Sequence, residues 1–356
     1  MTAQHSIAVI PGDGIGQEVV PAAIECLLRI GEHNDIAFSF AEFEWGSDYY
    51  HRHGRMMPVD ALDTMAEHEA IFLGAVGTPS IPDTETLWGM LIPIRRHFEQ
   101  YINLRPVKTM KGATSPLVTG RVIDLVIVRE NTEGEYSEVG GRTYRGLPQE
   151  TAIQEAIFTR FGISRAARFA ADLAQRRRGR LASATKSNGI VHTMPFWDEI
   201  VTEVVADYPG VTLESVLIDA LAARMVLQPW SFDVIVASNL FGDILSDLGS
   251  ALTGSIGVAP SGNLNPERKH PSMFEPVHGS APDIAGMGIA NPVGQIWAGA
   301  MMLEHLGHPD AALQLTSAFE SVLASGRSTR DLGGTMSTAE FTQAVCDQID
   351  VIASAA

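Results

Sequence analysis

Two aspartates four residues apart, Asp243 and Asp247, follow a segment with the composition of a buried strand, 232–238. A helix capped by Asn239 would place both carboxylates on neighbouring turns of one face. Like charges in one place repel each other unless a cation lies between them, and hard divalent ions prefer oxygen ligands. The pair therefore indicates a divalent metal site. The alternative is a solvated helix face, because acidic residues near a helix start complement its dipole.

A third carboxylate, Asp219, ends another strand-like segment, 213–219, and an apolar helix is expected over 220–227. Neither Cys nor His stands beside these aspartates in the chain. Three oxygen donors without nitrogen or sulfur favour Mg²⁺ or Mn²⁺ over zinc.

Three arginines, Arg95, Arg105 and Arg129, could hold a small polyanion beside such a cation. Guanidinium groups stay charged and bind carboxylates through two parallel hydrogen bonds. A lone arginine is more often an ordinary surface residue. The three together with a metal ion would make a site for a small organic acid.

Lys186 follows the strand-like segment 180–184, and Tyr136 follows the strand ending at Arg129. Positive neighbours would lower the pKa of Lys186 toward the range of a general base near neutral pH. Tyr136 could supply a phenolic proton. Taken singly, the lysine would be a solvated loop residue and the tyrosine a half-buried strand residue.

Gly12, Gly14 and Gly16 lie between a strand-like and a helix-like segment, where a dinucleotide fingerprint could stand. Gln17 occupies the position of the third glycine of that fingerprint, so we predict no Rossmann nucleotide turn. A tight strand-to-helix turn is the simpler interpretation. A second Gly-rich loop over 274–292 is long for a compact domain, which indicates a functional loop.

Composition bounds the function. At 356 residues the chain exceeds the usual size of one core, so two domains are expected. The net charge of −17 makes nucleic acid or an anionic membrane an improbable partner. Only two cysteines occur, Cys26 and Cys346, and neither a secretory signal nor a membrane span is apparent. A cytoplasmic protein without disulfides is expected.

Strand-like and helix-like segments alternate from the start of the chain, which predicts an α/β sandwich with much parallel sheet. The segment 139–162 is rich in Gly, Arg, Thr and Tyr, as expected of an extended arm, and a helix is predicted over 164–178. Residues 254–294 are expected to be a Gly-rich loop. Ser337 and Glu340 form a plausible capping box that opens the last helix.

The motifs together resemble the β-decarboxylating dehydrogenases, the family of isopropylmalate, isocitrate, homoisocitrate and tartrate/D-malate dehydrogenases. The segments 239–247 and 275–283 carry the resemblance most specifically. Within the family, segments 45–50, 86–89, 128–136 and 183–189 are most similar to the tartrate/D-malate branch.

The resemblance implies a two-domain, non-Rossmann α/β fold with a mixed central sheet. It implies a discontinuous cofactor-binding domain, 1–102 plus 254–356, and a substrate, metal and dimerisation domain, 103–253. It also implies a homodimer in which each active site takes Lys186 and Asp219 from the other subunit. The requirement for a monovalent cation such as K⁺ stays open, as does a tetramer in place of the dimer.

The resemblance also implies roles for individual residues. Tyr136 and Lys186 fall on the catalytic pair. The three arginines fall on substrate-carboxylate positions, and the three aspartates fall on the metal ligands. The expected cofactor-binding residues are Thr78, His278, Gly279, Ser280, Ala281, Pro282, Asp283, Ile284 and Asn291.

The cofactor expected from the last loop is NAD. Asp283 can accept hydrogen bonds from a ribose hydroxyl and would repel a 2′-phosphate, while Ile284 offers no charge to bind one.

Substrate choice is expected to rest on the segment before Arg95, where Trp88, Met90 and Leu91 face the C3 substituent in the family. The bulk of Trp88 favours a small substituent, as in D-malate or tartrate. If Trp88 packs elsewhere, 3-isopropylmalate becomes the alternative substrate. A non-catalytic regulatory subunit is the alternative from another functional class, although the chain retains every expected metal and catalytic residue.

Overall fold

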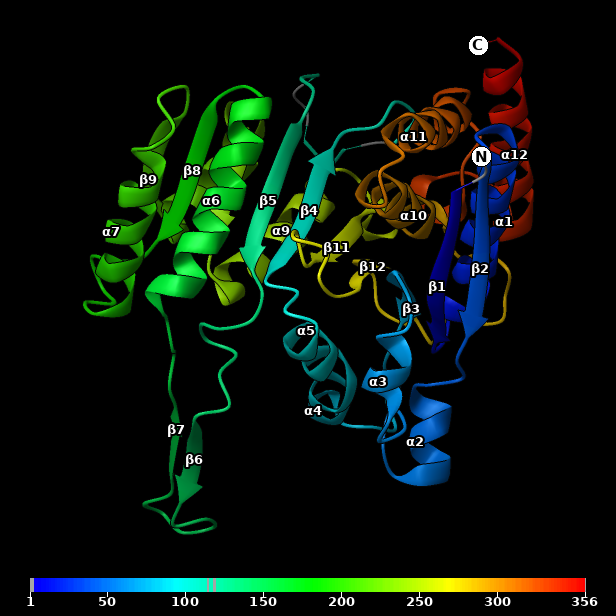
Figure 1. The fold of residues 1–356 in the computed structure, drawn as a ribbon. Coiled ribbons are helices and arrows are strands. Elements are labelled where there is room, and N and C mark those ends of the chain that lie inside the picture. The colour runs from blue at the N-terminus through cyan, green and yellow to red at the C-terminus, as the bar shows by residue number, and fades with distance from the viewer. Residues whose placement is uncertain (1–2, 114, 118–119, 356) are drawn as a thin grey trace. The chain divides into compact units, whose positions relative to one another are not determined.

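The computed structural model describes residues 3–113, 115–117 and 120–355, and Figure 1 traces the chain. The chain forms two compact units. Unit 1 contains Met1–Gln100, Lys108–Thr119 and Ser250–Ala356, and unit 2 contains Tyr101–Val107 and Gly120–Gly249. Unit 1 is thus discontinuous. The predicted assignment of cofactor binding to one domain and metal binding to the other stays a prediction, since compactness does not report what a unit binds.

The sheet of unit 1 has the strand order β2-β1-β3-β12-β11. Its first three strands, β1 (Ala3–Gly12), β2 (Ile36–Glu42) and β3 (Ala70–Ala75), are parallel and joined through helices such as α1 (Gly16–His33). Strand β12 (Ser272–Pro276) runs parallel to β3, and β11 (Pro260–Leu264) runs antiparallel to β12. The sheet is therefore mixed.

Strands β11 and β12 lie within the segment 254–294, so the expectation of one long loop there is wrong. All five residues of each strand are buried. Pro260-Ser-Gly-Asn-Leu264 has none of the β-branched or aromatic residues that usually signal a strand, and its neighbours in the sheet supply the missing stabilisation.

Helices of unit 1 cover its sheet. Helix α10 (Val293–His305) is buried from Val293 through Leu303, as is typical of a helix at the centre of a core, and it packs on α11 (Pro309–Ala324) and α1. Helix α12 (Thr338–Ala355) packs on α1, where the thiols of Cys26 and Cys346 lie 3.9 Å apart and both cysteines are free. The shorter elements of unit 1 are α2 (Ser47–His53), α3 (Ala61–Met65), α4 (Asp83–Thr86), the π-helical turn η1 (Leu87–Leu91), α5 (Ile92–His97) and the 3₁₀ turns Ile256–Val258 and Arg330–Leu332.

The predicted capping box is confirmed. The Ser337 hydroxyl accepts a hydrogen bond from the backbone N–H of Glu340 at 3.2 Å, and the Glu340 carboxylate accepts one from the backbone N–H of Ser337 at 2.8 Å. The reciprocal bonds satisfy two donors at the N-terminus of α12.

The sheet of unit 2 has the order β4-β5-β10-β8-β9. Strand β10 (Val234–Ala237) is parallel to β5 (Asp124–Glu130) and β8 (Arg180–Thr185), and β8 is parallel to β9 (Thr212–Leu217). The remaining elements are β4 (Ile102–Lys108), α6 (Arg160–Arg176), α7 (Thr193–Val205), α8 (Ile218–Leu227), the 3₁₀ turn Pro229–Ser231 and α9 (Asn239–Leu252).

The expected extended arm is an antiparallel hairpin of β6 (Gly140–Thr143) and β7 (Thr151–Gln154), whose residues are all exposed (Figure 1). Helix α6 begins four residues before its predicted start, because the Thr159 hydroxyl caps it by accepting the backbone N–H of Gly162 at 2.9 Å. The predicted α/β class with a mixed sheet is confirmed. In the described part of the chain no helix has the length and apolar character needed to cross a bilayer.

Candidate active site

Helix α9 begins where the buried strand β10 ends, and Ser238 joins the two. The hydroxyl of Ser238 accepts the backbone N–H of Phe241 at 3.4 Å, and its carbonyl accepts that of Gly242 at 2.8 Å. Ser238 is therefore the cap, and the expectation that Asn239 caps this helix is wrong by one residue. The Asn239 side chain is engaged elsewhere: its Oδ1 accepts from Nε and Nη2 of Arg129 at 3.0 and 2.7 Å.

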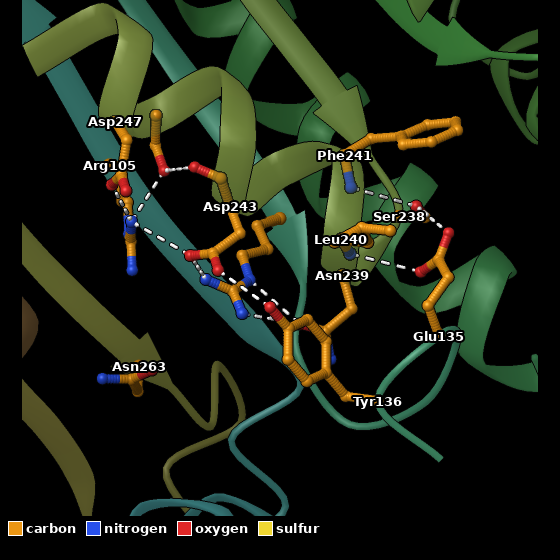
Figure 2. Close-up of polar contacts among 12 residues, drawn as sticks. Arg105, Glu135, Tyr136, Ser238, Asn239, Leu240, Phe241, Asp243, Asp247 and Asn263 are labelled. Atoms are coloured by element: carbon orange, nitrogen blue, oxygen red, sulfur yellow. Dashed lines mark hydrogen bonds and ion pairs between the residues drawn. The ribbon is translucent and has the colours of Figure 1, made fainter. Parts of the chain in front are cut away.

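Asp243, one turn into α9, is the centre of a polar cluster in unit 2. Its Oδ1 accepts from Nη1 of Arg129 and lies 3.5 Å from Nη1 of Arg105. Its Oδ2 accepts the phenolic O–H of Tyr136 at 3.0 Å. Figure 2 shows Tyr136 and Arg105 approaching the Asp243 carboxylate. Both arginines are nearly buried, at 4% exposed for Arg129 and 8% for Arg105, so their charges act at short range with little screening.

Asp247 lies one turn further along the same face of α9. Its Oδ1 is 3.4 Å from Nη1 of Arg105, which also donates to the Ser246 hydroxyl at 2.7 Å. Burial raises the pKa of Asp247 above its usual value; Arg105 opposes that rise, and the nearby Asp243 carboxylate adds to it. The predicted proximity of Asp243 and Asp247 is thus present in the structure, with two guanidinium groups beside them.

Lys186 and Asp219 form a separate pair. Lys186 follows β8, Asp219 lies in the first turn of α8, and Nζ is 2.5 Å from the carboxylate Oδ1. The hydrogen bond from Lys186 lowers the pKa of Asp219. The Asp219 side chain is 65% exposed and that of Lys186 32%, so the pair is open to solvent or to another molecule.

Within the described ranges of this single chain, no three His, Cys, Asp or Glu side chains converge as metal ligands. Asp243 and Asp247 supply two carboxylates whose hard oxygen donors suit Mg²⁺ or Mn²⁺. The metal site at these two carboxylates, and the contribution of Asp219 from another subunit, stay predictions.

In unit 1 a cavity of about 750 Å³ opens at the carboxyl ends of β1, β2 and β3. Its walls include the Gly12–Gly14 turn together with Thr78, Ser280 and Pro282, three of the predicted cofactor residues. The backbone N–H of Ile15 donates to the carbonyl of Ser280 at 2.8 Å. A Cβ at Gly14 would come within 2.0 Å of that same carbonyl oxygen, so only glycine fits this approach.

Asp13 fastens the cavity wall. Its carboxylate accepts the backbone N–H and the hydroxyl of Ser47 at 2.8 and 2.5 Å, and the backbone N–H of Gly77 at 2.7 Å. The loops after β1, β2 and β3 are thereby tied together beside Thr78. This role of Asp13 was not predicted, although the residue stands between Gly12 and Gly14 of the glycine turn.

The loop predicted to bind the cofactor contains one residue in an unusual backbone conformation. Ala281 has a φ of +40°, a conformation that L side chains rarely adopt and that clusters at functional sites. Ala281 and Ile284 pack on a small apolar cluster of Ile15, Val19 and Ala290.

Two further loop residues differ in how their polar atoms are used. Nε2 of His278 is buried without a hydrogen-bond partner among the described residues, and burial lowers the pKa of the ring. Asn291, by contrast, uses both ends of its amide within the protein. It donates to Asp331 at 2.9 Å and accepts the backbone N–H of Val293 at 3.0 Å, near the start of α10. Asn291 therefore fixes the end of the loop, while His278 retains an open nitrogen.

Arg95 and the segment before it also lie in unit 1. Nη2 of Arg95 donates to Glu275 at 3.1 Å, and Glu275 also accepts from Asn263 at 2.7 Å. The guanidinium of Arg96 lies 5.2 Å from the centre of the Trp88 ring, within cation–π range. Trp88 and Leu91 belong to the π-helical turn η1, and Leu91 packs on the core.

Met90, in the same turn, is fully buried in the core of unit 1. The expectation that it lines the substrate position is therefore not supported. A π-helical turn is a geometry that is often found at functional sites.

The predicted residues thus fall into four groups: an α9 cluster of Arg105, Arg129, Tyr136, Asp243 and Asp247; a Lys186–Asp219 pair; a cavity and loop with Thr78 and residues 278–284 and 291; and Arg95 with Glu275, near the Trp88–Leu91 turn. Asn239, which orients Arg129, was missed as a site residue. The available signal was an amide four residues before Asp243, but Asn is also a common helix cap, and the cap was predicted instead.

The whole chain is similar to known proteins. A family model described as isocitrate/isopropylmalate dehydrogenase matches residues 6–345. A Bacillus subtilis protein named probable tartrate dehydrogenase/decarboxylase is 56% identical over 348 residues, covering 97% of this chain and 98% of the relative. The Escherichia coli protein named D-malate dehydrogenase (decarboxylating) is 52% identical over 350 residues, covering 96% of this chain and 97% of the relative.

A solved structure is also similar. The crystal structure of isocitrate dehydrogenase from Methylococcus capsulatus superposes with a TM-score of 0.88 at 34% identity, and the match covers 97% of this chain and 99% of that one. The likeness therefore extends over nearly the whole fold.

Proposed function

Because the chain belongs to the isocitrate/isopropylmalate dehydrogenase family and is therefore an oxidoreductase, we propose that it oxidises and decarboxylates a small 2-hydroxy diacid with NAD and Mg²⁺ or Mn²⁺. D-malate, converted to pyruvate and CO₂, is the first candidate substrate, and tartrate is the second. Relatives at 52–56% identity that are named for tartrate and D-malate support both candidates.

The α9 cluster is the observation that carries this proposal. Two carboxylates, two nearly buried guanidinium groups and a phenol meet within one stretch of unit 2. The carboxylates suit a hard cation, the arginines suit a substrate carboxylate, and the phenol suits proton transfer. A purely structural ion-pair network would not require the tyrosine hydroxyl to point at the same aspartate.

Substrate binding and proton transfer are assigned to different residues of this chain. Arg105 and Arg129 hold a carboxylate of the substrate through paired hydrogen bonds, and Arg95 is the third arginine predicted to bind one. Lys186, contributed together with Asp219 by a second copy of the chain, takes the proton from the C2 hydroxyl as general base. A divalent cation held by Asp219, Asp243 and Asp247 would supply stabilisation of negative charge on the C2 oxygen, and NAD on the loop 278–284 would supply the hydride acceptor. Tyr136 donates a proton to C3 after CO₂ has left.

The turn that contains Trp88 supports a substrate with a small C3 substituent. The contact of Trp88 with Arg96 gives the indole a defined partner, and its volume beside Leu91 favours hydrogen or hydroxyl at C3. 3-Isopropylmalate is the alternative substrate, because its larger apolar substituent would fit if Trp88 packs elsewhere and leaves the slot open.

The preference for NAD rests on charge. Asp283 is exposed on the loop, and Asp13, Glu42, Glu44 and Asp48 line the cavity beside it. Carboxylates repel the additional 2′-phosphate of NADP. His278 offers the loop an unsatisfied nitrogen for a ligand donor.

A kinetic panel tests the proposal. Formation of reduced nicotinamide is followed by absorbance with NAD, Mn²⁺ and, in turn, D-malate, the tartrate isomers and 3-isopropylmalate. We expect the highest kcat/KM with D-malate or a tartrate isomer, and loss of turnover after exhaustive chelation that Mn²⁺ restores. Highest kcat/KM with 3-isopropylmalate would establish the alternative substrate, and turnover that survives chelation would contradict the metal assignment.

A further inference from the structure

Glu135, the residue before the proposed proton donor Tyr136, binds the beginning of α9. One carboxylate oxygen accepts the hydroxyl of Ser238 at 2.8 Å, and the other accepts the backbone N–H of Leu240 at 3.2 Å. Leu240 is in the first turn of α9, where backbone N–H groups have no partner within the helix and where a negative charge is favourable. Figure 2 shows the Glu135 carboxylate directed at Ser238 and Leu240.

A second contact joins the same two segments. Nδ2 of Asn239 donates to the backbone carbonyl of Glu133 at 3.1 Å. Gly134, between the two glutamates, is buried with a φ of +84°, and a Cβ there would lie 3.5 Å from Cβ of Asn239. The chain at 133–135 is therefore fastened to the first residues of α9 from both sides.

The attachment sets the position of Tyr136 relative to Asp243, which the proposed reaction needs. Tyr136 is bonded to Glu135, and its hydroxyl meets Asp243 one turn along the helix whose start Glu135 holds. We propose that Glu135 is a positioning residue: its carboxylate fixes α9 against the 133–136 segment, so that Asp243 keeps its place for the metal ion and Tyr136 its place for proton transfer. The inference rests on the proposed function, since it gives Asp243 and Tyr136 their roles.

Glu133 supplies a matched comparison from the same motif. Its carboxylate accepts the backbone N–H of Thr159 at 3.0 Å and the Thr159 hydroxyl at 2.8 Å, at the start of α6. Both glutamates thus bind the N-terminal end of a helix through one hydroxyl and one backbone N–H. Only Glu135 does so at the helix that carries Asp243 and Asp247, so loss of either should cost similar stability while only one should disturb the site.

The experiment compares Glu135→Gln and Glu135→Ala with Glu133→Gln and Glu133→Ala in the full-length protein. The melting temperature is measured by calorimetry, the Mn²⁺ dissociation constant by electron paramagnetic resonance without substrate, and kcat and KM with D-malate. We expect both positions to lower the melting temperature by a few degrees. Only the Glu135 variants should weaken Mn²⁺ binding and lower kcat, each by about 10-fold or more, as is usual when a residue that orients metal ligands is removed.

Glu135 variants that match the Glu133 variants in Mn²⁺ affinity and in kcat would overturn the inference. The Gln variant keeps the size of the side chain, so the comparison survives if the Ala variant does not fold. Wild-type protein that oxidises none of the acids would overturn the proposed function instead. In that case hydrogen exchange at the Leu240 amide decides the attachment alone: exchange that is not faster in Glu135→Gln than in Glu133→Gln overturns it.

Discussion

At the scale of single residues, the site is organised around Asp243, which two guanidinium groups and one phenol approach within unit 2. Such a carboxylate could be a structural ion-pair partner or a ligand held ready. Turnover distinguishes the structural role from the catalytic one. The informative variant removes a group of the proposed site that makes no contact within the Asp243 cluster. Lys186, which pairs with the exposed Asp219 and not with this cluster, is such a group.

Lys186→Met is expected to reduce turnover of D-malate by about 10² to 10⁴-fold, because a positioned general base contributes that much. Initial rates under saturating NAD and Mn²⁺ measure the loss. Lys111→Met, which removes an exposed lysine outside the proposed site, is the matched control and should leave turnover unchanged. Undiminished turnover in the Lys186 variant would eliminate the proposed proton transfer.

Asp283→Lys combined with Ile284→Tyr is expected to shift cofactor preference toward NADP. The change replaces a repelling carboxylate on the exposed loop with a cation that can pair with a 2′-phosphate. The ratio of kcat/KM for NAD to that for NADP measures the shift. Asp310→Lys alters the net charge by the same amount as Asp283→Lys on another exposed residue, so an equal shift in both proteins would show a nonspecific charge effect.

At the scale of helices and strands, the sequence predicted best where a local pattern and a local interaction coincide. The capping box at Ser337 and the strand-to-helix step before Asp243 both appear as expected, because neighbouring residues make the contacts. Strand β11 was missed because its own composition lacks strand-forming residues, and it is its pairing with β12 that the composition does not reveal.

The candidate site shows the same limit. Residue types and spacing predicted that Asp243 and Asp247 lie together, because four residues make one helical turn. They could not predict that Asn239 would face Arg129, or that Asp13 would tie loops 34 and 64 residues away. Those contacts depend on how the strands are ordered in each sheet, which composition does not specify. The sharing of a site between two subunits also stays a prediction.

Ser337→Ala is expected to destabilise the protein by about 1 kcal/mol, the usual cost of losing a helix cap. Its hydroxyl accepts the Glu340 N–H and donates to the Glu340 carboxylate, and the hydrogen bonds from Ser337 lower the pKa of Glu340. Denaturant midpoints at pH 7 measure the loss. Ser354→Ala, near the other end of α12, removes a hydroxyl that donates only to the carbonyl of Asp350 and should have little effect. Equal midpoints for the wild type and Ser337→Ala would contradict the capping role.

At the scale of the whole molecule, a strongly acidic chain buries three of its positive charges, Arg95, Arg105 and Arg129. The net charge is −17, yet Arg105 and Arg129 stand together beside α9. An anionic substrate, as proposed, would be repelled by the surface in general and attracted at the buried guanidinium groups. The cytoplasmic location and the homodimer expected from the sequence stay predictions.

The stability of unit 1 is expected to fall in acid partly through His305. Burial, aided by the charge of Arg268, lowers the pKa of His305 from 6.5 to about 4. The unfolded chain therefore takes up a proton between those values that the folded chain refuses, so stability declines as pH falls from about 6.5 toward 4. Between pH 7 and pH 5 this group accounts for roughly 2 kcal/mol.

His305→Leu should remove that part of the acid sensitivity. Urea midpoints at pH 7 and pH 5 give the change for the wild type and the variant, and the variant should lose less stability between the two. His192→Leu, at an exposed position, should retain the wild-type difference. Identical pH dependence in wild type and His305→Leu would show that the buried imidazole is not responsible.

The discontinuity of unit 1 has a consequence for biosynthesis. Strands β1 and β3 can be covered on one side by α1 alone until β12 and α10, some two hundred residues later in the chain, have left the ribosome. Unit 2 consists of Tyr101–Val107 and the continuous segment Gly120–Gly249. All of it is therefore synthesised before β12 and α10. The first hundred residues of the nascent chain therefore expose apolar surface until the end of translation. We expect chaperones to bind this part of the chain during synthesis.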